Sequence, residues 1–275
     1  MTQPYRSVVV GTDGSPTARR ALDASISVAI ALDVPLTIAT AFERGMFDRP
    51  SASVQSHFPG GFAMGQEAGW AREVATDAAA IARQAGVADV RQTTPVGAAA
   101  EALIELASRS ADDLIVVGTR GLSETAERVV GNIPHELTHH AHNDLLMIHR
   151  EGPVWQSVCL ATDGSGTANL ACARGLAFAR AVGATATLVT IAKDAAVGEA
   201  TLVAAAAALG APDLARRVVA GHGHVGDELA EAATEFDLLT LGNRGMSGIA
   251  RILGSVPNTV THQIPTDLLL VNTSR

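Results

Sequence analysis

Short apolar runs rich in valine, leucine and isoleucine alternate along the chain with longer alanine-rich stretches. The runs lack the polar alternation of a half-exposed strand, as in LIVVG at residues 114–118, which favours strands that are covered on both faces. Strands are predicted near residues 7–11, 36–41, 90–94, 114–118, 145–149, 158–161, 186–191, 217–220, 238–241 and 268–272. In the first half, helices are predicted in the gaps, near residues 17–32, 66–85, 98–108 and 134–142. Strand–helix alternation with right-handed crossovers predicts a doubly wound α/β sandwich on a parallel sheet.

The chain carries the same sequence pattern twice. VVVGTDGSPTA at 8–18 returns as VCLATDGSGTA at 158–168, and GTRGLS at 118–123 returns as GNRGMS at 242–247. A third segment, from Gly131, returns from Gly254 in the same order, which predicts two homologous domains at residues 1–150 and 151–275. The second copy is shorter, and most of the lost length faces residues 43–65, which are rich in Gly, Pro and Ser and are expected to form a surface loop.

Composition excludes several classes of function. The formal net charge of -8 and the aromatic content of 3% argue against nucleic acid as a partner, because phosphate backbones need a basic face and bases stack on aromatic rings. The two cysteines, Cys159 and Cys172, are expected to be small buried residues in a reducing compartment. The sequence has neither a signal-peptide pattern nor an apolar run of membrane-spanning length, which predicts a cytoplasmic protein that does not bind membranes.

The repeated motifs fall where a doubly wound sheet binds ligands, at the carboxyl ends of its strands. Asp13 and Asp163 follow the first strand of each half, and Gly118 and Gly242 close the fourth. The helix expected after each glycine-rich segment offers free N–H groups to an anion. The pattern therefore predicts a phosphate cradle, with a carboxylate nearby to hold ribose hydroxyls or a metal.

TDGS after the first strand, and a G-x2-G-x9-G-[S/T] pattern after the fourth, resemble the universal stress protein family in its tandem-domain, actinobacterial form. The resemblance implies a Rossmann-like, five-stranded parallel sandwich in each domain. It also implies an adenine-nucleotide site for ATP, alone or with Mg²⁺, in a regulator of stress or dormancy. In the first half the implied nucleotide-binding residues are Thr12, Asp13, Ala41, Gly118, Arg120, Gly121, Gly131 and Asn132. In the second half they are Thr162, Asp163, Ile191, Gly242, Arg244, Gly245, Gly254 and Ser255.

Both glycine loops depart from the family pattern. The first keeps the full spacing but ends in Asn132, whose amide caps a helix without replacing a phosphate-binding hydroxyl. The second has the hydroxyl of Ser255, but only eight residues separate Gly245 from Gly254. Residues 5–18 and 90–107 also resemble a branch of the family that binds cyclic AMP, which leaves that ligand open. A third alternative is a dimeric interaction module that binds no nucleotide. As in relatives, the two domains are expected to pack as an internal pseudo-dimer, with a homodimer as a further option.

Catalysis is not predicted, and hydrolysis of ATP is expected to be slow at most. The segment His135 to His139 fits H-E-x-x-H, the zinc-protease motif. The aligned residues of the second half are Asn258, Thr259, Val260, Thr261 and His262, so the same helix is expected there without the motif. A solvated helix face is therefore favoured over a metal site. Asp13 also has a simpler interpretation, as the cap of the next helix.

Overall fold

The computed structural model describes residues 3–44, 66–119, 132–152, 154–243, 256–257, 260–261 and 264–274. Contacts divide the chain into two compact units: Tyr5–Asn143 with Met147–Pro153, and Met1–Pro4 with Asp144–Leu146 and Val154–Arg275. We call them the first and the second unit. The domain boundary between residues 150 and 151 stays a prediction, and the loop expected at 43–65 lies almost wholly outside the described residues.

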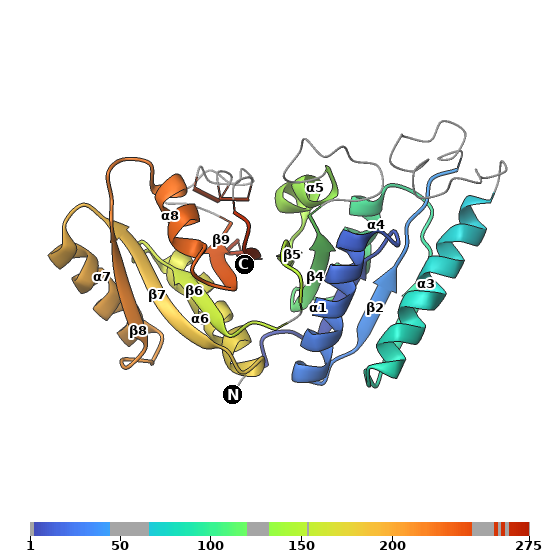
Figure 1. The fold of residues 1–275 in the computed structure, drawn as a ribbon, viewed down its shortest axis with the longest axis horizontal. Coiled ribbons are helices and arrows are strands. Elements are labelled where there is room, and N and C mark those ends of the chain that lie inside the picture. Colours follow the sequence, from blue (N-terminus) through green and yellow to red (C-terminus); the bar gives the residue numbers. More distant parts are fainter. Residues whose placement is uncertain are drawn as a thin grey trace. The chain divides into compact units, whose positions relative to one another are not determined.

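The sheet of the first unit has the strand order β3-β2-β1-β4, with all pairs parallel. The strand β5 follows β4 in the sheet order, and its residues are divided between the two units. The described helices of the first unit cover both faces: α1 and α3 lie over one face, and α4 lies over the other (Figure 1). The strands are β1 (Ser7–Gly11), β2 (Leu36–Ala39), β3 (Val90–Thr93), β4 (Asp113–Gly118) and β5 (Asp144–Ile148). The helices are α1 (Pro16–Leu32), α3 (Glu67–Gln84), α4 (Ala99–Ala107) and α5 (Asn132–His140).

The second unit repeats this arrangement with the order β10-β9-β6-β7-β8, again parallel. Its strands are β6 (Ser157–Ala161), β7 (Thr185–Ala192), β8 (Ala215–Ala220), β9 (Leu238–Gly242) and β10 (Asp267–Val271). Its helices with described bounds are α6 (Gly166–Ala181), α7 (Ala195–Ala208) and α8 (Val225–Ala233). The predicted fold class is confirmed, and each predicted element with described bounds lies within two residues of an observed one.

Small side chains explain why the layers pack closely. The central strands β4 and β9 are buried almost along their whole length, and four of the nine buried residues of α1 are alanines. Alanine loses no side-chain entropy in a helix and lets the helix approach the sheet. The order of the strands reverses between β1 and β4 in the first unit and between β6 and β9 in the second. These reversals place two equivalent crevices at the carboxyl ends of the strands. Among the described helices, none is long and apolar enough to span a membrane.

Both cysteines lie in the core of the second unit. Cys159 on β6 and Cys172 on α6 are fully buried, as predicted, and neither forms a disulfide. Burial raises the pKa of both thiols, and the pKa of Cys172 rises to about 12, with the charge of Asp163 as a second cause. The thiol of Cys172 donates a hydrogen bond to the carbonyl of Ala161.

Thiol labelling is therefore expected to report on the second unit alone. At pH 8 we expect a disulfide reagent to react at least about a hundredfold more slowly with the native protein than with protein in guanidinium chloride, because reaction needs an exposed thiolate. The measurement is the absorbance of the released thiol over time. Rapid labelling of the native protein would contradict the burial of these residues.

Candidate functional site

The TDGS segment forms a tight turn between β1 and α1. The Thr12 hydroxyl accepts a hydrogen bond from the Gly14 N–H at 3.3 Å, and Asp13 Oδ1 accepts one from the Ser15 N–H at 3.0 Å. The Ser15 hydroxyl then accepts from the Ala18 N–H at 3.2 Å and is the N-cap of α1. Gly14 has φ 77°, a left-handed conformation that favours glycine. The motif is thus a self-supporting turn, in which Asp13 holds the capping residue and is not itself the cap.

The second unit builds the same turn from the same residue types. The corresponding distances are 3.0 Å from Gly164 N to Thr162 Oγ1, 2.9 Å from Ser165 N to Asp163 Oδ1 and 3.2 Å from Ala168 N to Ser165 Oγ. Gly164 has φ 83°. The two turns therefore place Asp13 and Asp163 equivalently, at the carboxyl end of the first strand of each sheet.

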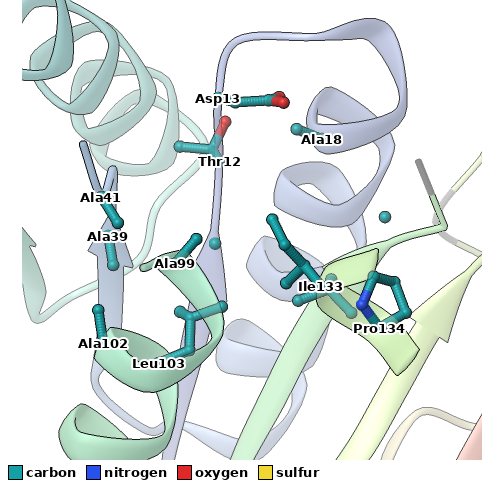
Figure 2. A pocket seen from close by; sticks show the side chains of 13 residues that line it. Thr12, Asp13, Ala18, Ala39, Ala41, Ala99, Ala102, Leu103, Ile133 and Pro134 are labelled. Atoms are coloured by element: carbon teal, nitrogen blue, oxygen red, sulfur yellow. The ribbon is translucent and has the colours of Figure 1, made fainter. Parts of the chain in front are cut away.

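A pocket opens beside this turn in the first unit (Figure 2). A water-sized sphere can occupy about 80 Å³ of it, within about 660 Å³ of empty space that extends into solvent. Predicted site residues from three strand ends line it together: Thr12 and Asp13 after β1, Ala41 two residues beyond β2, and Gly118 at the end of β4. The other described lining residues are Gly11, Ala18, Ala39, Ala99, Ala102, Leu103, Val117, Ile133 and Pro134.

An equivalent pocket of about 650 Å³ lies in the second unit. The predicted residues Thr162, Asp163, Ile191 and Gly242 line it, in the same relation to β6, β7 and β9. The remaining described lining residues are Ala161, Ser165, Ala168, Val189, Thr190, Val225, Leu229, Leu241, Val256 and Pro257. The sequence repeat is thus also a repeat of pockets.

The glycine loops fall outside the described residues. This applies to Arg120, Gly121 and Gly131 in the first unit, and to Arg244, Gly245, Gly254 and Ser255 in the second. Asn132 begins α5, but its side chain is outside the description. The residues just beyond the loops, Ile133 with Pro134 and Val256 with Pro257, line the pockets. Each loop is therefore followed directly by a helical residue at the pocket wall.

Apart from Ala41 and Ile191, sequence reasoning missed the apolar walls of both pockets. Ala39 lies two residues before Ala41 near the end of β2, while Ala99, Ala102 and Leu103 follow the spacing of one helix face. These periodicities were visible. Alanine carries no distinctive chemistry, however, so nothing marked these positions as part of a site rather than of the general core.

Gly118 has a packing role that the sequence did not reveal. A Cβ atom at this position would lie 2.6 Å from the Thr17 carbonyl oxygen and 3.2 Å from the Ala18 N, both in the first turn of α1. At Gly242 the nearest atom would be the Thr273 Cγ2, at 3.2 Å, and the Thr167 oxygen would be 3.7 Å away. In the first unit, glycine therefore allows close contact between β4 and α1, in addition to forming the pocket wall.

The H-E-x-x-H segment lies on α5. The rings of His135 and His139 have centroids 4.7 Å apart, and His135 and Glu136 are exposed. In the part of the chain that the structure describes, no three His, Cys, Asp or Glu residues are grouped so that they could hold a metal ion. The described geometry thus gives the pair no third protein ligand.

Comparison with known proteins follows the same two halves. The model of the universal stress protein family matches residues 4–149 and 193–272. A universal stress protein of Mycobacterium tuberculosis is 36% identical over 148 residues, which cover 53% of this chain and 97% of that protein.

Solved structures add two likenesses. A universal stress protein from Archaeoglobus fulgidus has a TM-score of 0.75 at 17% identity, covering 98% of each chain, and so shares the fold. A universal stress protein solved in complex with cAMP is 33% identical, covers 53% of this chain and 98% of that one, and has a TM-score of 0.39. The family match covers well over half of the sequence and reaches into both repeats, so the chain belongs to the universal stress protein family.

Proposed function

We propose that this protein binds an adenine nucleotide, ATP, at the carboxyl ends of β1, β2 and β4, and that occupancy of the site regulates its interactions. One observation carries the proposal: Asp13, Ala41 and Gly118, which are far apart in the sequence, line a single pocket. Each of them follows or closes a different strand. Convergence at the switch point of a doubly wound sheet is typical of a ligand site.

The pocket offers a partner for each part of a nucleotide. Apolar side chains from β2 and α4 suit the base, and the Asp13 carboxylate suits ribose hydroxyls. The N-terminal turn of α5 reaches the wall through Ile133 and Pro134, so its free N–H groups suit phosphate. Mg²⁺ would be held mainly through the phosphates, as is usual for this ion.

The described wall favours binding over catalysis. Its polar side chains are those of Thr12 and Asp13, among otherwise apolar residues and glycines. General acid–base catalysis needs a titratable group close to the proton that it moves, and nucleophilic catalysis needs a nucleophile with an adjacent base. A single carboxylate beside a hydroxyl that already accepts a backbone N–H provides neither pair. A regulatory role therefore fits the described site better than turnover.

The nucleotide content of gently purified protein tests the proposal. Heat-released ligand is identified by mass spectrometry, and thermal unfolding is then followed with ATP plus Mg²⁺ and, separately, with cAMP. A ligand that binds the folded state must raise the midpoint, and we expect ATP to do so. Stabilisation by cAMP alone would identify cAMP, instead of ATP, as the ligand. If no nucleotide is bound and neither ATP nor cAMP raises the unfolding midpoint, nucleotide binding is rejected. The alternative of an interaction module that binds no nucleotide would then be favoured.

Replacing Asp13 with asparagine is expected to weaken ATP binding about tenfold or more while leaving the ligand-free protein nearly as stable. Asparagine keeps an oxygen that can accept the Ser15 N–H, but it removes the charge that strengthens hydrogen bonds from ribose hydroxyls. Titration calorimetry measures the affinity, and thermal unfolding checks the turn. Asp163→Asn makes the same change in the other turn and is the matched control. Unchanged affinity in the double variant would contradict a role for either carboxylate.

A further inference from the structure

The two pockets differ systematically along one wall, and this difference bears on which of them holds the proposed nucleotide. In the first unit four alanines form that wall: Ala39 and Ala41 near the end of β2, and Ala99 and Ala102 on α4. Figure 2 shows them gathered on one side of the pocket, below Thr12 and Asp13. We call these four residues the alanine wall.

Every residue of the alanine wall has a larger counterpart in the second unit. The sequence offset of 150 that relates Asp13 to Asp163 pairs Ala39 with Val189 and Ala41 with Ile191. The equivalent helices α4 and α8 begin at Ala99 and Val225, which pairs these two residues. Two of the three larger hydrophobic side chains, those of Val189 and Ile191, extend from β7, and all three line the second pocket.

The fourth counterpart, Glu228, replaces Ala102 by a carboxylate. Its Oε1 atom accepts hydrogen bonds from the N–H groups of His222 and Gly223, the latter at 3.1 Å. These two residues belong to the connection between β8 and α8. Glu228 therefore ties this connection to the helix, and it is not one of the residues that line the second pocket.

The difference in the wall is one of shape. The space that a water-sized sphere can occupy is about 80 Å³ in the first pocket and about 140 Å³ in the second, so the second pocket is not the smaller of the two. Alanine ends at Cβ, so a wall of four alanines follows the backbone and presents an even surface to which a flat ring system can pack closely. Branched side chains at three of these positions interrupt that surface, and close packing tolerates added methyl groups poorly.

We propose that the protein binds one nucleotide per chain, in the first unit, with the base against the alanine wall, and that the uneven wall of the second pocket does not pack against the base. This inference rests on the proposed function. It identifies the residues that distinguish two otherwise equivalent sites, because both units keep the same turn and the same carboxylate.

Calorimetric titration of the full chain with ATP and Mg²⁺ tests the proposal, and cAMP is titrated in parallel. We expect one nucleotide per chain. Ala41→Ile and Ala99→Val each give the first pocket the residue of the second, and both are expected to weaken binding about tenfold or more. Ala41 and Ala99 are half-buried. Two independent variants are used in case one of them misfolds. Circular dichroism and thermal unfolding show whether each variant is folded.

Ile191→Ala and Val225→Ala are the matched controls in the second unit, and they are expected to leave the affinity of the first site unchanged. A second nucleotide bound by the double control variant would further support the role of the wall. Two equal sites in the native chain, or unchanged binding by both folded first-unit variants, would overturn the inference while leaving the proposed function intact. Absence of binding of either nucleotide to the native chain would instead reject the proposed function and the inference together.

Discussion

Replacing Gly118 with alanine is expected to destabilise the first unit by about 3 kcal/mol, because the added methyl group has no space. Its Cβ would lie 2.6 Å from the carbonyl oxygen of Thr17 and 2.8 Å from the carbonyl carbon. Both atoms belong to the backbone at the start of α1, which cannot rotate away as a side chain can. Helix and strand must therefore separate, and the melting midpoint of this unit should fall by roughly 10 °C.

The second unit provides the control for this prediction. Gly242→Ala places its Cβ 3.2 Å from Thr273 Cγ2 and 3.5 Å from Ala171 Cβ. Because these neighbours are side-chain atoms at longer range, the cost should stay below about 1 kcal/mol. Hydrogen exchange measured by mass spectrometry assigns each loss of stability to its unit. Equal costs for the two variants would show that the close contact at Gly118 does not control stability.

Replacing Asn143 with leucine is expected to lower the free energy of unfolding of the first unit by about 3 kcal/mol. The buried Asn143 side-chain Nδ2 lies 3.1, 2.8 and 3.0 Å from the carbonyl oxygens of Ala107, Ser110 and Asp113. It therefore fastens the end of α4 to the start of β4. Leucine fills a similar volume but removes this donor. The Ser110 oxygen still accepts the Asp113 N–H at 3.1 Å, whereas the Ala107 and Asp113 oxygens lose the Asn143 amide as a partner, and a hydrogen bond lost in a buried setting is costly. Denaturant unfolding measures the loss.

The second unit performs the same task with a smaller group, which supplies a graded comparison. Thr266 occupies the aligned position, and its hydroxyl lies 3.2 Å from the Ala233 oxygen and 3.3 Å from the Phe236 oxygen. Thr266→Val removes one hydroxyl donor whose hydrogen bonds are longer than those of Asn143, so we expect the free energy of unfolding to fall by about 1 kcal/mol. Asn143→Thr should fall between the native chain and Asn143→Leu. A cost for Asn143→Leu no larger than for Thr266→Val would contradict the network.

The elements of the fold could be predicted because their signals are local. Apolar runs located the strands, and the repeat of TDGS located two equivalent turns, whose hydrogen bonds join residues only two or three positions apart. The family pattern named Asp13, Ala41 and Gly118, which do line one pocket. Their roles as nucleotide ligands stay predictions.

The rest depends on contacts between residues far apart in the sequence. Ala99 and Ala102 join Ala39 in one wall only because α4 packs beside β1, and alanine itself gives no hint of this. The packing role of Gly118 likewise depends on where α1 begins against β4. Glycine after a strand lets a ligand come close to the backbone, and the same lack of a side chain also allows close helix–sheet contact.

The self-supporting turn also affects how related sequences should be interpreted. Because Asp13 and Asp163 hold the residues that cap α1 and α6, a duplicated copy can lose its ligand and still keep TDGS for the sake of folding. A database search for that tetrapeptide therefore selects chains able to form the turn, whether or not they bind anything. Residues at positions equivalent to 39, 41, 99 and 102 would sort such chains more usefully, since they can change without breaking the turn.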